Sequence, residues 1–395
     1  MTDRIYLDHA ATTPLDPRVE EAMRPFARER FGNAGSIHSF GREAKAALDS
    51  ARDATARVLG CACAEVVFTG GGTESDNLAL LGVARAARSP CDRHPGPPGL
   101  GANRQRGNHV VISAFEHHAV MGAALLLEEW GFAVSRLPVT PDGMVEPQSL
   151  AEAMRDDTIL VSVMLANNEV GAIQPVAELA AIARERGALF HTDAVQAAGA
   201  VALEVDRLGV DLMSLSAHKI YGPKGVGALY VRRGTRITSI MGGGEQEREL
   251  RPGTENVPGI IGFAAALELA EEMRKAETAR LAPLRDKLVT GVLDTIPGSR
   301  LNGAREPRIA ANANFAFEGV SGETLLVKLD LLGIAASSGS ACAAGSLEPS
   351  HVLRAMGLTK PLAQSALRIT LGRATTERDI DRVLEVLPQV IAELR

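Results

Sequence analysis

Short apolar segments alternate with longer segments of helical periodicity between residues 66 and 216. We predict strands at 66–68, 109–113, 133–137, 159–164, 188–192 and 210–215. Strands that alternate with helices in this way predict an α/β fold with a mostly parallel sheet and helices on both of its faces. Ligands of such sheets bind outside the carboxyl ends of the strands.

Several residues that could bind a ligand follow directly on these predicted strands. They are Gly72, Thr73, His117, Asn168, Asp193 and Lys219. Because the carboxyl ends of parallel strands meet at one edge, a single crevice can gather all of them.

Lys219 lies at the exit of a buried strand, between His218 and a Gly/Pro-rich turn. A single lysine in such a place is most simply a solvated turn residue. Asp193 changes this interpretation, because an aspartate that follows a strand is suited to hold a pyridinium nitrogen. Enzymes that use pyridoxal 5′-phosphate (PLP) need such a partner for the ring to act as an electron sink.

Two further segments point to the same chemistry. Gly70, Gly71 and Gly72 stand between a strand and a helix, where free backbone N–H groups bind a phosphate well. The segment 338–346 consists mostly of small residues and carries Cys342.

Together these segments resemble the cysteine desulfurases, within the class V aminotransferase group of PLP enzymes. The resemblance extends from residues 6–14 to residues 367–373, and the motifs occur in the family's order. Residues 338–342, followed by 347–350, are similar to the NifS/IscS-like branch, which supplies sulfur for iron–sulfur and thio-cofactor assembly. The resemblance implies the PLP-dependent transferase fold type I. We therefore expect a large PLP-binding domain at 15–258 and a small C-terminal α/β domain at 259–395, joined by residues 1–14.

The resemblance also implies roles for individual residues around PLP. Lys219 is expected to carry the cofactor covalently, Asp193 to pair with the pyridine nitrogen, and Gln196 to bind the ring hydroxyl. His117 is expected to stack on the ring. The phosphate is expected to be held by the backbone of Gly72 and by Thr73, Ser216 and His218.

Substrate and subunit contacts follow from the same resemblance. Asn168 and Arg368 are expected to clamp the carboxylate of L-cysteine; taken alone, they could be a buried amide and a surface arginine. Thr254 matches a residue that reaches the phosphate of the neighbouring subunit's cofactor, which implies a homodimer. His118 and His191 lack a match and are expected to be structural.

The implied activity is the PLP-dependent removal of sulfur from L-cysteine. Lys219 would remove the Cα proton, and the Cys342 thiolate would take the sulfur as a persulfide, leaving L-alanine. The persulfide would pass to a sulfur-acceptor protein such as an iron–sulfur scaffold. Three alternatives stay open: a class V aminotransferase that uses serine or alanine, a lyase acting on selenocysteine or cystine, and a non-enzymatic scaffold that kept the fold.

Composition sets further limits. The 395 residues carry a net charge of −6, without the basic excess that nucleic-acid binding favours, and no apolar run reaches the roughly 20 residues of a membrane span. The first motif begins within five residues of the N-terminus, so we expect no signal peptide and a cytoplasmic location.

Cys61 and Cys63 lack nearby metal ligands, so we predict no metal site. Residues 89–108 are rich in Pro and Gly, and we predict a surface insertion.

Overall fold

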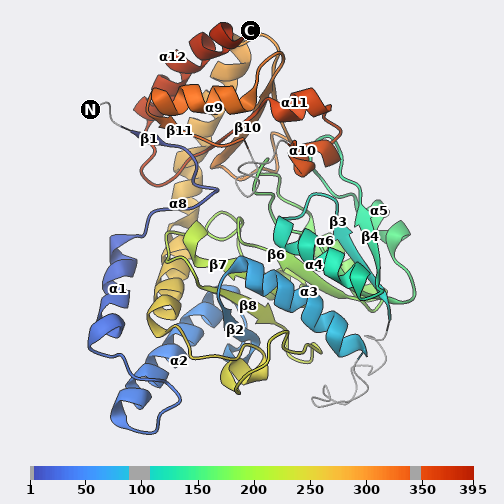
Figure 1. The fold of residues 1–395 in the computed structure, drawn as a ribbon, viewed down its shortest axis with the longest axis vertical. Helices are drawn as coiled ribbons and strands as arrows, with labels where there is room; N and C mark the ends of the chain where they lie inside the picture. Colours follow the sequence, from blue (N-terminus) through green and yellow to red (C-terminus); the bar gives the residue numbers. More distant parts are fainter. Residues whose placement is uncertain (1–3, 89–106, 339–347) are drawn as a thin grey trace.

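The computed structural model describes residues 4–88, 107–338 and 348–395 (Figure 1). Cys342 and nearly all of the predicted insertion lie outside the described residues.

A seven-stranded sheet forms the centre of the larger part, with the strand order β2-β8-β7-β6-β5-β3-β4. The strands are β2 (Val66–Thr69), β3 (His109–Ser113), β4 (Ala133–Leu137), β5 (Thr158–Ser162), β6 (Leu189–Asp193), β7 (Leu212–Ser216) and β8 (Gly227–Val231). Only β8 runs antiparallel to its neighbours in this sheet. The predicted mostly parallel sheet is therefore confirmed, and β8 is the strand that was not predicted.

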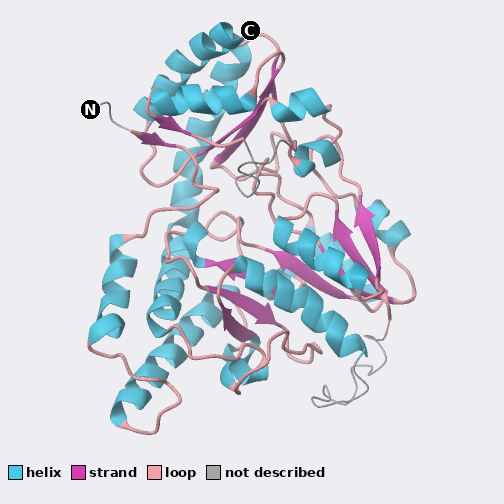
Figure 2. Ribbon diagram, viewed as in Figure 1, coloured by secondary structure: helices cyan, strands magenta, loops and turns pink. Residues whose placement is uncertain are grey.

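Helices cover both faces of this sheet. Successive residues of a strand point to opposite faces, so neighbouring side chains belong to different apolar clusters. Val67, Leu189 and Leu212 pack in one apolar cluster with the helices α3 (Gly72–Arg88) and α4 (His118–Glu129). The adjacent Phe68, Phe190 and Met213 pack in another cluster on the opposite face. That face is covered by α2 (Ser39–Leu59), α6 (Val176–Glu185) and the first part of α8 (Val257–Thr295). Figure 2 shows the resulting layers of helix, sheet and helix.

The ends of the first helices follow from local sequence. Asp16 caps α1 (Pro17–Arg28), because its side chain accepts a hydrogen bond from the Arg18 backbone N–H at 2.9 Å. Pro17 occupies the first helical position, where its missing N–H costs nothing. Gly60 ends α2 in the left-handed conformation with a φ of 68°. Short helices, α5 (Pro147–Ala153) and α7 (Val205–Leu208), complete this part of the molecule.

A smaller α/β unit contains two further sheets. One is antiparallel with the order β12-β10-β9, and the other pairs β1 with β11 in parallel. Its elements are β1 (Ile5–Tyr6), β9 (Ser299–Leu301), β10 (Asn312–Phe317), β11 (Ile334–Ala335), β12 (Ala366–Thr370), α9 (Gly322–Leu331), α10 (His351–Ala355), α11 (Lys360–Gln364) and α12 (Glu377–Leu394). Phe315, Phe317 and Leu329 lie in its own apolar core.

The long helix α8 connects the two cores (Figure 1). Its apolar residues up to Ala270 pack in the larger core, and those from Leu281 onward pack in the smaller one. The division of the chain at residues 258 and 259 stays a prediction.

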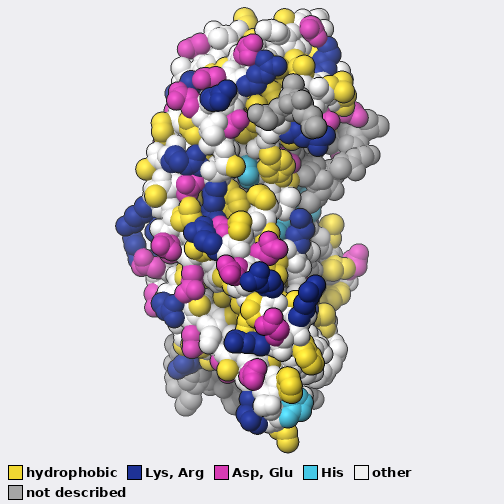
Figure 3. Space-filling view, turned by 90° about the vertical axis from the view of Figure 1, so that its left-hand side faces the viewer, with side chains coloured by type: hydrophobic (Ala, Val, Ile, Leu, Met, Phe, Trp, Pro, Cys, Tyr) yellow, Lys and Arg dark blue, Asp and Glu magenta, His cyan; other side chains and the backbone are white. Residues whose placement is uncertain are grey.

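Charged side chains of both signs lie on the surface of the molecule (Figure 3). On the face that Figure 3 shows, basic and acidic side chains are interspersed. Within the described ranges, no helix is both long and apolar enough to cross a bilayer.

Candidate active site

A cavity of about 230 Å³ opens at the edge of the large sheet where the parallel strands end. All the predicted site residues that the structure describes line it, except Thr254, and these are Gly72, Thr73, His117, Asn168, Asp193, Gln196, Ser216, His218, Lys219 and Arg368. Thr254 is exposed, as a contact to a neighbouring subunit would require. Cys342 lies outside the described residues.

The turn between β2 and α3 forms one wall of the cavity and accepts no bulkier residues. Gly71 has a φ of 143°, and a Cβ on Gly72 would lie 2.8 Å from Val195 Cγ2. The hydroxyl groups of Thr69 and Ser75 lie 2.7 Å apart and brace the turn. The glycines leave the backbone at the start of α3 accessible from the cavity, which suits a phosphate. At the edge of this turn, Glu74 Oε2 accepts a hydrogen bond from the Gly70 N–H at 2.9 Å, and Arg251 pairs with the same carboxylate.

A shallow depression continues the cavity at this turn. Thr12, Ser216, His218 and Lys224 line it together with the glycine turn. A basic side chain and hydroxyl groups around a helix N-terminus suit the phosphate ester of PLP.

Asp193 lies at the carboxyl end of β6, with only 5% of its surface exposed. Its Oδ1 accepts a hydrogen bond from the Val195 backbone N–H at 2.9 Å. Burial raises the pKa of Asp193 to about 6, although Lys219 acts in the opposite direction. A buried carboxyl group that faces a cavity gains from a cationic partner, and the protonated nitrogen of a pyridine ring is such a partner.

Lys219 ends a short 3₁₀ turn, η2 (Ala217–Lys219), directly after β7. Its Nζ donates hydrogen bonds to the carbonyl oxygens of Ala10 at 2.6 Å and Ala11 at 2.7 Å. Gln196 Nε2 donates to the same Ala10 oxygen at 2.8 Å. Lys219 is therefore held at the cavity by the N-terminal segment, and it is not the solvated turn lysine that its sequence taken alone would suggest.

The histidines that line the cavity are neutral near pH 7. Burial, assisted by the charge of Lys219, lowers the pKa of His117 to about 4. The same causes in the same order lower the pKa of His218 to about 4. His117 caps α4, since its Nδ1 accepts a hydrogen bond from the Ala119 N–H at 3.2 Å. His118 also lines the cavity, whereas His191 is fully buried behind it.

Arg368 enters the cavity from β12 of the smaller unit, and only 1% of its surface is exposed. Its guanidinium donates hydrogen bonds to the backbone oxygen of Asn168 at 3.1 Å and to Asp8 Oδ1 at 2.8 Å. The alternative of a surface arginine is therefore wrong. Arg368 and Asn168 lie together, as a clamp for a carboxylate requires.

Sequence reasoning missed several buried acids around this cavity. Asp76 and Glu169 line it. Glu116 lies behind His117, where Ser113 and the Met164 N–H donate to it, and burial raises its pKa to about 8. No spacing in the sequence distinguishes these residues from the other acids of the chain.

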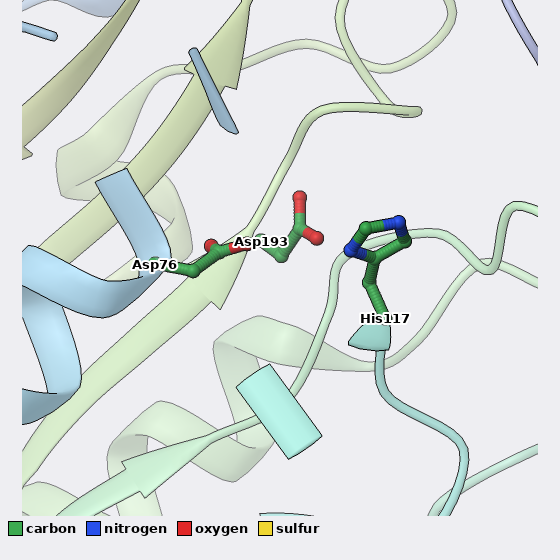
Figure 4. A group of neighbouring side chains, drawn as sticks. All are labelled: Asp76, His117 and Asp193. Atoms are coloured by element: carbon green, nitrogen blue, oxygen red, sulfur yellow. The ribbon is translucent and has the colours of Figure 1, made fainter. Parts of the chain in front are cut away.

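Potential metal ligands come together in one place within the described ranges. Single donor atoms of Asp76, His117 and Asp193 lie within 4.8 Å of one another (Figure 4). These side chains belong to the cavity wall that suits PLP. Cys61 and Cys63 form no such group; Cys63 Sγ instead lies 2.7 Å from Asp53 Oδ1.

Comparison with known families identifies the family of this chain. The family described as Aminotransferase class-V matches residues 5–93 and 97–383. The chain belongs to this family. Class-V aminotransferases are PLP-dependent enzymes, and the glycine turn, Asp193 and Lys219 of this member fit that cofactor.

Individual relatives narrow the group within the class-V family. The chain is 48% identical to "Cysteine desulfurase IscS" of Dictyoglomus turgidum, over 100% of this chain and 96% of that protein. It is also 48% identical to "Cysteine desulfurase IscS" of Methanosarcina thermophila, over 99% and 93%. The solved structure titled "NIFS-LIKE PROTEIN" has a TM-score of 0.89 at 37% identity, and 99% of this chain and 100% of that chain are covered. The structure titled "SspA in complex with cysteine" has a TM-score of 0.78 at 32% identity, with 93% and 98% covered.

These similarities confirm the family recognised in the sequence, the fold type I of PLP enzymes and the cysteine desulfurase class. The roles of the individual site residues stay predictions.

Proposed function

We propose that this protein is a PLP-dependent cysteine desulfurase that converts L-cysteine to L-alanine and carries the sulfur as a persulfide on Cys342. One observation carries the proposal: Lys219, Asp193, the glycine turn and Arg368 line a single cavity, although they come from distant parts of the chain. A tether, a partner for a ring nitrogen, a phosphate cradle and a carboxylate ligand are the requirements of a PLP enzyme that acts on an amino acid. The relatives named as cysteine desulfurases and the neighbour solved with cysteine support this choice of substrate.

The cofactor is held by residues that the fold already positions. Lys219 binds PLP covalently, Asp193 pairs with the ring nitrogen, and the N-terminus of α3 binds the phosphate with Thr73, Ser216 and His218. Gln196 and His117 contact the ring. PLP, when bound, supplies an electron sink for the carbon that loses its proton.

The substrate is oriented by its carboxylate. Arg368 offers a planar fork of N–H donors, which suits a carboxylate better than a lysine would. Asp8 and the Asn168 carbonyl fix this fork from behind, and the Asn168 side chain adds a second ligand to the carboxylate.

Protons are handled by groups next to the bound amino acid. The Lys219 amine takes the Cα proton. His117 is neutral near pH 7, so its imidazole can accept or donate a proton beside the ring.

Sulfur transfer requires a thiolate, and Cys342 is the proposed nucleophile. The Cβ–S bond of L-cysteine breaks, and an S–S bond forms with Cys342 Sγ. The electron pair left on the carbon takes up a proton, so the organic product is L-alanine. Cys342 then carries the transferred sulfur.

Further parts of this proposal concern assembly and location. Thr254 is exposed and would reach the phosphate site of a second subunit in a homodimer. A sulfur-acceptor protein, such as an iron–sulfur scaffold, would take the persulfide. A cytoplasmic location stays a prediction from the sequence.

The test is to incubate the PLP-loaded protein with L-cysteine and to locate the added mass of one sulfur atom by mass spectrometry. We expect the added sulfur on Cys342 and an equivalent amount of alanine. Cys342→Ala should keep bound PLP yet form no persulfide and almost no sulfide. Unchanged turnover in Cys342→Ala would refute the role of this cysteine, and conversion of a keto acid in place of alanine formation would indicate an aminotransferase.

A further inference from the structure

Asp76 is the fifth residue of α3, one helical turn after the glycines of the cavity wall. Only 1% of its surface is exposed, yet it lines the same cavity as Asp193. An acid in the first turns of a helix normally faces solvent, where it interacts with the helix dipole. Asp76 is instead directed into the protein, toward the ligand site.

Asp76 and His117 approach Asp193 from opposite sides (Figure 4). One side-chain oxygen of each aspartate lies within 4.8 Å of the other. No described residue donates a hydrogen bond to Asp76 Oδ1. Two buried carboxylates at this separation cannot both carry a charge without a large electrostatic cost.

No described cation compensates a charge on Asp76 at close range. His191 Nε2 lies 3.6 Å from Asp76 Oδ1, but burial lowers the pKa of His191 to about 3, so its imidazole is neutral. Both ring nitrogens of His191 are hydrogen-bonded to hydroxyl groups, Nδ1 to Ser162 at 2.8 Å and Nε2 to Ser214 at 2.9 Å. The titratable groups around Asp76 on all neighbouring elements are Asp193, His191, Glu116, His117, His218 and Lys219.

The charges of these groups favour one charged carboxylate and one neutral carboxyl group beside the proposed position of the pyridine ring. Burial, followed by the charge of Asp193, raises the pKa of Asp76 well above its ordinary value. Each carboxyl group has one hydrogen-bond donor, Ser214 for Asp76 and the Val195 N–H for Asp193, but only Asp193 also has the nearby Lys219 as a favourable charge. The proton therefore belongs on Asp76, and the negative charge belongs on Asp193.

We propose that Asp76 is a positioning residue for Asp193. It is a neutral, proton-bearing carboxyl group that orients the Asp193 carboxylate toward the pyridine nitrogen and adds no second negative charge. This inference rests on the proposed PLP site, and it concerns the ring nitrogen and not the sulfur transfer.

Because Asp76 is proposed to be neutral, its replacement by asparagine should have little effect on PLP binding. Asp76→Asn has the same shape, is neutral at every pH and still offers N–H donors toward Asp193. It should therefore bind PLP within about twofold of the wild type. Asp76→Ala removes the group that orients Asp193, and we expect PLP binding to weaken about tenfold.

The experiment uses the whole protein loaded with ¹⁵N-labelled PLP. The ¹⁵N chemical shift of the ring nitrogen reports whether it is protonated, and it is followed from about pH 6 to about pH 10 together with the dissociation constant of PLP. Wild type and Asp76→Asn should keep the chemical shift of a protonated ring nitrogen over this whole range. Asp76→Ala should lose that shift at a pH within the range. Glu185→Gln removes an exposed carboxylate on α6 and serves as the control.

Two results would overturn the proposal. If Asp76→Asn loses PLP or the protonated shift as strongly as Asp76→Ala, Asp76 acts as a charged group. If Asp76→Ala keeps the wild-type shift and affinity, Asp76 has no part in the site. Asp76→Ser takes the place of Asp76→Ala if that variant fails to fold. A wild type that binds no PLP would instead refute the proposed function itself.

Discussion

Arg368 and Asp8 are 360 positions apart in the chain, and a hydrogen bond of 2.8 Å joins their side chains at the wall of the cavity. Asp8 belongs to the N-terminal segment whose Ala10 and Ala11 carbonyls hold Lys219. The first residues of the chain therefore connect the proposed carboxylate ligand to the proposed catalytic lysine.

Arg368→Lys is expected to raise the KM for L-cysteine by about 10- to 100-fold, with a smaller effect on kcat. A lysine keeps the charge but cannot form the two-pronged contact with a carboxylate while it also binds Asp8. Steady-state kinetics of alanine formation measures both constants. Arg300→Lys, at an exposed position on β9, is the matched control. A wild-type KM in Arg368→Lys would rule out the proposed clamp.

Asp8→Asn tests the partner of the same pair. An amide can still accept a hydrogen bond from Arg368, but it lacks the charge that fixes the guanidinium. We expect an increase in KM of about three- to tenfold, smaller than that of Arg368→Lys, because roughly 1 kcal/mol of orientation is lost. The double variant should be less than additive, since both changes affect one contact. Fully additive effects would mean that the two residues act independently.

Gly72→Ala is expected to weaken PLP binding about tenfold. The added Cβ would lie 2.8 Å from Val195 Cγ2 and would displace the start of α3, where the phosphate is proposed to bind. A fluorescence titration of the apoprotein with PLP measures the loss. Gly122→Ala is the control, because a Cβ there meets nothing within 4 Å and alanine favours the helix. Equal PLP affinities in the two variants would contradict the phosphate site.

Glu116→Gln should make the stability of the apoprotein less dependent on pH. Burial raises the pKa of Glu116 from its ordinary 4.5 to about 8, so the folded state binds this proton more tightly than the unfolded state. The stabilisation is fully present below about pH 4.5 and is lost as the pH rises through about 8. Between these values, the free energy of unfolding of the variant should fall by about 1–3 kcal/mol less than that of the wild type.

Urea unfolding at a series of pH values measures this difference. The buried histidines, whose pKa values are lowered, act at the acid end and are present in both proteins. Glu185→Gln, which removes an exposed carboxylate, should follow the wild-type curve. Parallel curves for Glu116→Gln and the wild type would show that Glu116 is charged in the folded protein.

The sequence predicted all strands of the seven-stranded sheet except β8, and the order in which the site residues follow them, because hydrophobic periodicity and strand ends are local signals. β8 was missed because its five residues, Gly227–Val231, follow a Gly/Pro-rich turn without an intervening helix. The Arg368–Asp8 pair joins distant segments, which no local pattern reveals. Asp76 has the local sequence of an ordinary helix-start acid, and only the packing of α3 against β6 and β7 buries it. The roles of Cys342 and Thr254 remain predictions that rest on the resemblance.

The central claim is that PLP is bound covalently to Lys219 opposite Asp193. It is tested most directly by reducing the PLP-loaded protein with borohydride, digesting it and identifying the modified peptide by mass spectrometry. The account predicts that the adduct lies on Lys219 and that Lys219→Ala forms none. An adduct on another lysine, or the same amount of adduct in Lys219→Ala, would contradict it.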